Sequence, residues 1–352
     1  MPSVVHIVVT GRFAGVERYV CDVATETSGR DWDVAVIGGE PRQMPALLGD
    51  RVRWEPGATV PEALRAIGRV GRADIYHAHM TKAEALAVAT RRRHKARVVS
   101  TRHFAARRGA SHVGRIVAPW IATGITREIA ISAFVAGQLE RPPDAVIVSG
   151  VPKSPCLWQT TNRVALVLQR LEPEKDTITA LRAWQASRLV DEGWSLRLVG
   201  EGSERGQLER WVAAEGPAGV TFAGWTDDVA AEFCRAGILL ASAPAEPLGL
   251  AVLEAMAAGV PVVACASGGH LETIGQLVDA PLFPPGDPFA AAQALRALLS
   301  DSVRTRLAET GRRQASESFS IECHVDRLLG EYDTARGERN PQSSGTAIME
   351  LR

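Results

Sequence analysis

Short apolar runs alternate with helical stretches along the first 150 residues of the chain. The runs are rich in Val and Ile, and the stretches between them repeat their apolar positions with the period of a helix. Such alternation predicts a parallel sheet whose two faces are covered by helices. The predicted strands are residues 4–10, 34–37, 75–79, 98–101, 128–131 and 146–148, and the first predicted helix is 16–27.

The pattern breaks at residues 152–163, where Pro, Thr and Asn gather as in a linker, and a second series then begins. The sequence therefore predicts an α/β protein with two doubly wound, Rossmann-like domains, 1–155 and 156–330, and a flexible polar tail, 331–352. In the second domain the predicted strands are 164–168, 196–199, 220–222, 238–241 and 262–264. The helices predicted there are 178–189, 205–214, 228–235, 249–258, 288–299 and 302–317.

The charge of the chain is unevenly distributed, although its formal net charge is zero. Residues 1–150 hold 21 Lys and Arg against 14 Asp and Glu, so the first half is basic and the remainder is acidic. This asymmetry predicts attraction of the N-terminal domain to an anionic acceptor or to acidic lipid headgroups, with a solvated basic face as the alternative. No recognition motif for nucleic acid is present. The basic positions are Arg91–Arg93, Lys95, Arg102, Arg107, Arg108 and Arg115.

The cysteines and the N-terminus indicate a cytoplasmic protein. The five cysteines are scattered without a C-x-x-C pair, so we expect buried thiols in a reducing compartment and neither a disulfide framework nor a zinc site. Residues 1–7 read as a first strand and not as a signal peptide, and no run reaches the ~18 apolar residues of a membrane span. The cysteines are Cys21, Cys156, Cys234, Cys265 and Cys323.

The densest chemical signal is the segment E-P-L-G-L-A-V-L-E-A-M-A-A-G-V-P-V-V, which starts at Glu246. Gly249 stands where a helix is predicted to begin, and the unpaired N–H groups of a helix N-terminus suit a phosphate. Glu254 lies in the first turns of that helix, where a carboxylate can reach a ribose hydroxyl. Taken singly, each of these residues is better explained as a turn residue or a solvated charge.

Order and spacing together make this segment resemble the signature of the family 4 retaining glycosyltransferases, which have the GT-B fold. Four further segments match that family in the expected order, and a chance match to all five is improbable. The resemblance implies two Rossmann-like domains that face each other across a cleft, with a helix near 321–332 that returns to the N-terminal domain. The matching segments are R-L-E-P-E-K from Arg170, G-E-G from Gly200, F-A-G from Phe222 and G-G-H-L-E from Gly268.

The resemblance assigns the donor site to the second domain. Arg170 and Lys175 would hold the donor diphosphate. Because the diphosphate gains negative charge as it leaves, two cations placed there would stabilise the transition state. Glu246 would lie beside the donor sugar and Glu254 at the ribose. For Arg170 an ion pair with Glu172 or Glu174 is the alternative, and for Lys175 a solvated loop charge. The further donor-binding positions are Gly200, Phe222, Gly224, Gly249 and Leu250.

The N-terminal half matches the family more loosely. Gly15 belongs to a turn between the first strand and the first helix, where backbone N–H groups would meet a phosphate or the acceptor. His77 and His79 share one face of a strand, and the resemblance places His79, as a catalytic residue, against a sugar. His103 is a further candidate on the acceptor side. No metal site is expected, because no other ligands are near in sequence and no Asp-x-Asp motif is present.

The predicted function is transfer of a sugar from a UDP-, GDP- or dTDP-sugar, with retained configuration and without a prosthetic group. The acceptor would be a glycolipid, a cell-envelope glycan precursor or a secondary metabolite. Retention is explained either by attack from the face of the departing phosphate or by a double displacement with Glu246 as nucleophile. A sugar-nucleotide 2-epimerase and a non-catalytic protein that binds nucleotide-sugars remain as alternatives.

Overall fold

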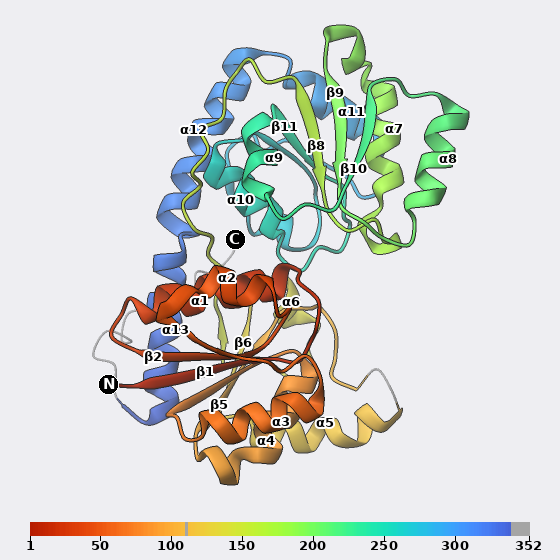
Figure 1. Ribbon diagram of the computed structural model, residues 1–352. Helices are drawn as coiled ribbons and strands as arrows, with labels where there is room; N and C mark the ends of the chain where they lie inside the picture. Colours follow the sequence, from red (N-terminus) through yellow and green to blue (C-terminus); the bar gives the residue numbers. More distant parts are fainter. Residues whose placement is uncertain (110–111, 339–352) are drawn as a thin grey trace. The chain divides into compact units, whose positions relative to one another are not determined.

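The structure, a computed structural model, describes residues 1–109 and 112–338 and divides into two compact units (Figure 1). Unit 1 comprises Met1–Ser149 together with the chain from Ile321, and unit 2 comprises Gly150–Ser320. Each unit has its own parallel sheet with helices on both faces. The predicted fold class, two Rossmann-like α/β domains, is therefore confirmed.

Unit 1 has a seven-stranded parallel sheet within the described residues, in the order β3-β2-β1-β4-β5-β6-β7. Its strands are β1 (Ser3–Val8), β2 (Asp33–Gly38), β3 (Arg53–Glu55), β4 (Ile75–His79), β5 (Arg97–Arg102), β6 (Arg127–Ala130) and β7 (Ala145–Val146). Its helices are α1 (Gly15–Ser28), α2 (Gln43–Leu48), α3 (Val60–Val70), α4 (Thr81–His94), α5 (His112–Gly124), α6 (Ala133–Gly137) and α13 (Ile321–Arg336), with the 3-10 turn Gly49–Arg51.

The alternation of side chains along each strand sorts the core of unit 1 into two layers. Val4 and Val8 of β1 pack on the face that α1, α2 and α13 cover. Val5 and Ile7 point to the opposite face, which α3, α4 and α5 cover (Figure 1). Burial on both faces is why these strands read as continuous apolar runs in the sequence.

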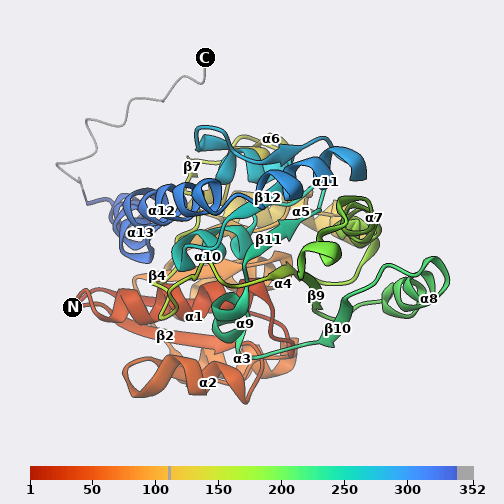
Figure 2. The same ribbon diagram turned by 90° about the horizontal axis from the view of Figure 1, so that it is seen from above.

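Unit 2 repeats the same winding, with a six-stranded parallel sheet in its described residues in the order β10-β9-β8-β11-β12-β13. Figure 2 shows α8 at one edge of this unit, on the side of the edge strand β10. The strands are β8 (Val164–Leu168), β9 (Ser195–Val199), β10 (Val220–Gly224), β11 (Ile238–Ala241), β12 (Val262–Cys265) and β13 (Leu282–Phe283). The helices are α7 (Thr177–Ser187), α8 (Arg205–Glu215), α9 (Val229–Arg235), α10 (Leu250–Ala258), α11 (Pro288–Ala297) and α12 (Asp301–Ser318). Shorter 3-10 turns span Pro173–Lys175, Leu189–Glu192, Gly268–Leu271 and Ile274–Gln276.

The predicted limits of the second domain, 156–330, differ from this division. Helix α13 belongs to unit 1, because Val325, Leu328 and Tyr332 are fully buried in the core beneath α1. The expected return of a helix near 321–332 to the N-terminal domain is thus confirmed. The tail predicted from 331 begins instead as the last turns of α13, and residues 339–352 lie outside the described residues.

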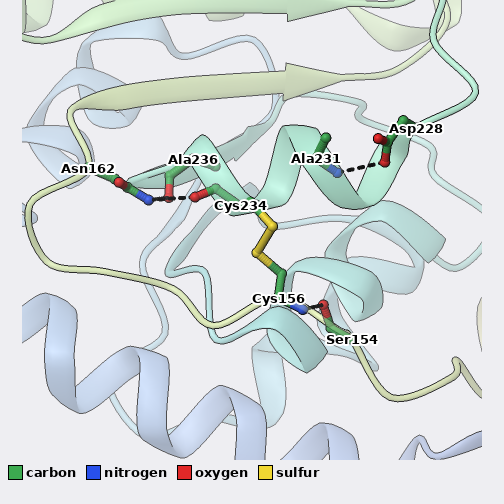
Figure 3. Close-up of a disulfide and its surroundings, with 7 residues drawn as sticks. All are labelled: Ser154, Cys156, Asn162, Asp228, Ala231, Cys234 and Ala236. Atoms are coloured by element: carbon green, nitrogen blue, oxygen red, sulfur yellow. Dashed lines mark hydrogen bonds between the residues drawn. A yellow bond between two sulfur atoms is a disulfide. The ribbon is translucent and has the colours of Figure 1, made fainter.

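A disulfide between Cys156 and Cys234 contradicts the expectation that the cysteines remain thiols (Figure 3). Cys156 lies in the connector that leads into β8, and Cys234 lies in α9, 78 residues further along the chain. Asn162 fastens the other end of the connector to α9, because its Nδ2 donates to the carbonyl oxygens of Cys234 at 2.9 Å and Ala236 at 3.2 Å. Sequence spacing could not show that this connector folds back over α9. Cys21 and Cys265 are buried, as expected.

Among the helices that the structure describes, none combines the length and the apolar character needed to cross a bilayer.

The disulfide predicts a stability difference between the oxidised and reduced chain. A cross-link over 78 residues restricts the unfolded ensemble, so replacement of Cys156 and Cys234 by Ser should lower the free energy of unfolding by about 2–4 kcal/mol. Urea unfolding monitored by circular dichroism measures this change. A reductant should destabilise the wild type and leave the double variant unaffected, and equal sensitivity of both proteins would contradict the cross-link.

Candidate functional site

The candidate donor site of unit 2 lies where its strand order reverses, between β8 and β11. In doubly wound sheets, ligands bind outside the carboxyl ends of the strands at this switch point. The loop after β8 carries Arg170 and Lys175, and the loop after β11 carries Glu246. The parallel sheet therefore brings Lys175 and Glu246 together from two loops far apart in the sequence.

Lys175 and Glu246 form an ion pair across these two loops. The distance from Lys175 Nζ to Glu246 Oε2 is 2.5 Å, and the two side chains retain 15% and 19% of their exposure. A pair so enclosed is more strongly coupled than an exposed one, because less water screens it. The alternative interpretation of Lys175, a solvated loop charge, does not describe this arrangement.

Two residues that sequence reasoning missed hold the Lys175 loop in place. Gln169 Nε2 donates to the carbonyl oxygen of Lys175 and to Thr177 Oγ1, both at 3.0 Å, and Ser242 Oγ donates to the same carbonyl at 3.0 Å. Ser242 is fully buried, so its hydroxyl has no water to replace this bond. The only sequence signal was a polar residue directly after each of the apolar strands β8 and β11.

Glycines allow the loops at the carboxyl ends of the strands to touch. A Cβ atom on Gly200, whose φ is +139°, would lie 1.9 Å from the carbonyl oxygen of Gln169. A Cβ atom on Gly269 would lie 2.3 Å from the Cα of Leu248, while the Gly269 N–H donates to the carbonyl oxygen of Glu246 at 2.8 Å. These glycines fit the motifs from which the sequence predicted them, because no side chain has room there.

Helix α10 begins at the same edge of the sheet. Gly249 is its N-cap residue, in a left-handed conformation with φ +92°, and it lies against the His270 ring. Burial lowers the pKa of His270, and the nearby Glu246 carboxylate opposes that shift only in part, so the imidazole is neutral at pH 7. Leu250 opens the helix, and Glu254 is half-buried one turn further on. The first N–H groups of a helix have no partner within the helix, and at this end they follow Glu246 closely in the chain.

Arg170 lies apart from the ion pair. Its side chain is 57% exposed and pairs with Glu174 at 2.6 Å, which matches one of the two alternatives weighed for it. Phe222 is partly buried against the core of unit 2, and Gly224 has a positive φ of +77° beside Glu201. The structure therefore groups Lys175, Glu246 and the start of α10 tightly, with Arg170 on the surface of the same loop.

The predicted histidines of unit 1 belong to a buried network. His79 Nδ1 is 3.0 Å from His103 Nε2, and His79 Nε2 is 3.1 Å from Nδ1 of His6, a residue that sequence reasoning missed. His77 contacts Tyr332 Oη at 2.6 Å and Thr101 Oγ1 at 2.7 Å. His77 and His79 have no exposed surface, and His103 retains 7%.

Burial governs the charge of this network. Burial lowers the pKa of His6 and His103 to about 3, and burial together with the neighbouring histidines holds the pKa values of His77 and His79 well below the usual value. All four rings are therefore neutral at pH 7. Gly15, by contrast, is exposed at the first turn of α1, at the carboxyl end of β1.

Two arginines assigned to a basic face are buried in ion pairs, which corrects that part of the prediction. Arg108 contacts Glu84 at 2.6 Å, Glu128 at 2.8 Å and Glu140 at 2.5 Å, and Arg102 contacts Glu128 at 2.7 Å. Burial acts to raise the pKa of Glu128, but Arg108 and Arg102 outweigh it and leave that pKa below its usual value. The positions Arg91–Arg93, Lys95 and Arg107 are exposed, as a basic surface requires.

Two family models match the chain in succession. The model described as Glycosyltransferase Family 4 matches residues 13–151, and the model described as Glycosyl transferases group 1 matches residues 154–314. Together they cover nearly all of the chain between residues 13 and 314. The protein thus belongs to the family 4 glycosyltransferases, as the sequence motifs predicted.

Curated relatives match parts of the chain. The lipopolysaccharide core biosynthesis glycosyltransferase LpsE of Rhizobium meliloti is 35% identical over 39% of this chain and 41% of its own length. The GDP-mannose-dependent alpha-mannosyltransferase of Mycobacterium tuberculosis is 32% identical over 50% of this chain and 44% of its own. The chain thus spans less than half the length of these two relatives.

Solved structures share the fold over nearly the whole chain. Anabaena HepE, in complex with UDP and glucose, superposes with a TM-score of 0.77 at 18% identity, over 95% of this chain and all of its own. The sucrose-phosphate synthase of Thermosynechococcus elongatus gives 0.77 at 19% identity, over 95% and 99% of the two chains. These likenesses place the fold in the GT-B class.

Gly269 predicts a test of the loop packing around Glu246. In Gly269→Ala the new Cβ collides with the Leu248 backbone, so the free energy of unfolding should fall by about 1–3 kcal/mol. Gly206→Ala is the matched control, because a Cβ there meets only the end of the Arg210 side chain at 3.5 Å. Chemical denaturation measures both, and equal stability of the two variants would show that the loop at Leu248 yields freely.

His324 predicts a loss of stability in acid. It is buried between Tyr19 Oη and the Val148 carbonyl, with Arg327 nearby, and burial lowers its pKa to about 4. Since the unfolded histidine titrates near 6.5, the unfolded chain binds more protons between pH 6.5 and pH 4. The free energy of unfolding should therefore decrease as the pH is lowered from 6.5 to 4. The decrease due to this residue is at most about 1.4 kcal/mol per pH unit. Urea titrations at several pH values measure the slope, and His324→Gln should reduce it; an unchanged slope would refute the assignment.

Proposed function

We propose that the protein transfers a sugar from a nucleotide diphosphate donor to an acceptor, with the donor held by unit 2. The observation that carries this proposal is the meeting of Lys175, Glu246 and the N-terminus of α10 at the switch point of the sheet. A cation and a row of free N–H groups suit a diphosphate, and an adjacent carboxylate suits sugar hydroxyls. Family membership supports the same assignment.

In this proposal the donor diphosphate replaces Glu246 as the partner of Lys175. The N–H groups of Gly249 and Leu250 then bind the phosphate oxygens, and Glu246 is released towards the sugar. Arg170 reaches the diphosphate at little cost, because its pair with Glu174 is exposed and such pairs contribute only about 0–1 kcal/mol. The two cations stabilise the charge that develops as the nucleotide leaves.

The remaining donor contacts follow the family motifs. Glu254 binds the ribose, and the segment with Phe222 and Gly224, together with the turn at Gly200, lies near the base. The reaction retains configuration, transfers a hexose and needs no metal ion, either by attack from the leaving-group face or with Glu246 as nucleophile. HepE is solved with UDP and a relative is named for GDP-mannose, so both nucleotides belong in a binding panel.

The acceptor would bind to unit 1. It would be a glycolipid, a cell-envelope glycan precursor or a secondary metabolite. Gly15 and His103 are the predicted acceptor residues with some exposed surface. His79 would have to leave its hydrogen bonds to His6 and His103 before its ring could touch a sugar. Two further predictions concern location. The exposed basic end of α4 would contact an anionic membrane, and the protein would be cytoplasmic.

Calorimetric titration with UDP, GDP and dTDP tests the proposal. One nucleotide should bind with micromolar affinity, and Lys175→Ala should weaken that binding by about 10–100-fold, the value of one charged hydrogen bond. Arg188→Ala is the control, because Arg188 is an exposed cation of the same unit. Binding of none of the three, or equal loss in both variants, would overturn the diphosphate assignment.

Product analysis then separates the alternatives. A transferase releases the nucleoside diphosphate when an acceptor is present, whereas a 2-epimerase keeps the nucleotide on its product. Binding without turnover over a broad acceptor panel would favour a protein that only senses nucleotide-sugars.

A further inference from the structure

Three histidines from two neighbouring strands meet inside unit 1. His6 of β1 is directly opposite His77 of β4 in the parallel register, and His79 follows two residues later on the same strand. All three point to the face of the sheet that α1 and α13 cover, since their neighbours Val4 and Val8 pack there while Tyr76 and Ala78 pack on the other face. None of the three has any exposed surface.

The ring nitrogens of these residues lie close enough to share one ligand. One nitrogen from each of His6, His77 and His79 lies within 4.8 Å of the others. The separation between His6 Nδ1 and His79 Nε2 is 3.1 Å. Zinc binds imidazole nitrogen at about 2.0–2.1 Å, so two nitrogens on one tetrahedral ion lie roughly 3.3 Å apart. That pair of nitrogens is thus already at a spacing that an ion requires.

His6 has bonding capacity that the described residues do not use. Its Nε2 atom is buried and has no hydrogen-bond partner among them. An ion on Nδ1, the nitrogen that faces His79, would not fill this position. Because no hydrogen bond among the described residues depends on Nε2, that nitrogen can carry the ring proton, and the Nδ1 lone pair is then open to an ion.

We propose that His6, His77 and His79 form a binding site for a divalent transition-metal ion of the kind that imidazole prefers, with Zn²⁺ as its chemical representative. The proposal goes beyond the glycosyl transfer assigned to unit 2 and does not rest on it. It replaces the expectation that no metal site exists, which considered only residues near one another in sequence.

The surroundings fit such a site in two ways. The rings are neutral at pH 7, because burial lowers their pKa values, so their lone pairs are available to a cation. Outer partners also hold the ligand rings: His103 contacts His79 Nδ1, and Tyr332 and Thr101 contact the two nitrogens of His77. An ion takes one of the His77 nitrogens, and the other keeps its hydroxyl partner, the usual outer contact of a metal-bound histidine.

The ion at this site would have a structural role. Its ligands come from the two strands at the centre of the sheet, and α13, which carries Tyr332, closes over it. An ion there joins β1 to β4 and, through the contact of Tyr332 with His77, also holds α13. Because the ion binds the folded chain, its binding stabilises unit 1. His77 and His79 then serve as ligands, and direct contact with a sugar falls to other groups.

Metal uptake by the full chain without a histidine tag tests the proposal. After treatment with a chelator, the wild type should bind one equivalent of Zn²⁺, measured by elemental analysis after gel filtration, and its Tm should rise by several degrees. His6→Gln should weaken binding at least tenfold. His94→Gln is the matched control, because His94 is a buried histidine of the same unit that contacts Ala87 and Tyr76 instead.

A measurement on the wild type covers the case in which His6→Gln does not fold. X-ray absorption of the zinc-loaded protein should show three imidazole nitrogens in the first coordination sphere. No uptake by the wild type, uptake that His6→Gln retains in full, or a coordination sphere without three imidazoles would each overturn the site. None of these readouts depends on transferase activity, so failure here leaves the donor assignment standing.

Discussion

Parallel strands that are buried on both faces are the constraint on which the rest of this structure depends. A parallel sheet requires helices on each face, and all its strands then end at the same edge. In unit 2 that edge gathers loops from β8 and β11, and so brings Lys175 to Glu246. In unit 1 the same requirement draws α13, from the far end of the chain, over the face that α1 leaves incomplete.

Charge inside the two units is handled in opposite ways. Unit 1 buries Arg108 against three glutamates, a fully paired cluster that stabilises the loop after β5 and offers little to a ligand. Unit 2 keeps Lys175 and Glu246 partly exposed beside the N-terminus of α10. An enclosed pair that retains access to solvent can exchange one partner for an incoming phosphate, whereas the paired cluster of unit 1 cannot without leaving a buried charge.

Histidine is used differently in the two units. His270 is neutral and packs on Gly249, where it shapes the start of α10. In unit 1 the rings around His79 bond to one another and to hydroxyl groups, deep below the surface. Neutral imidazoles in such a place are ligands or hydrogen-bonding groups, and an ordinary general base would need access to its substrate.

The sequence by itself determined both Rossmann-like series, most of their strands and the family motif that begins at Glu246, because buried parallel strands and glycine turns leave strong local signals. It missed β3 and β13, whose short edge runs have too few residues to form a pattern. Tertiary structure alone decided which residues meet across long separations: Cys156 with Cys234, His6 with His79, and α13 with the first sheet. Such contacts arise from the winding of the chain, and no local pattern records them.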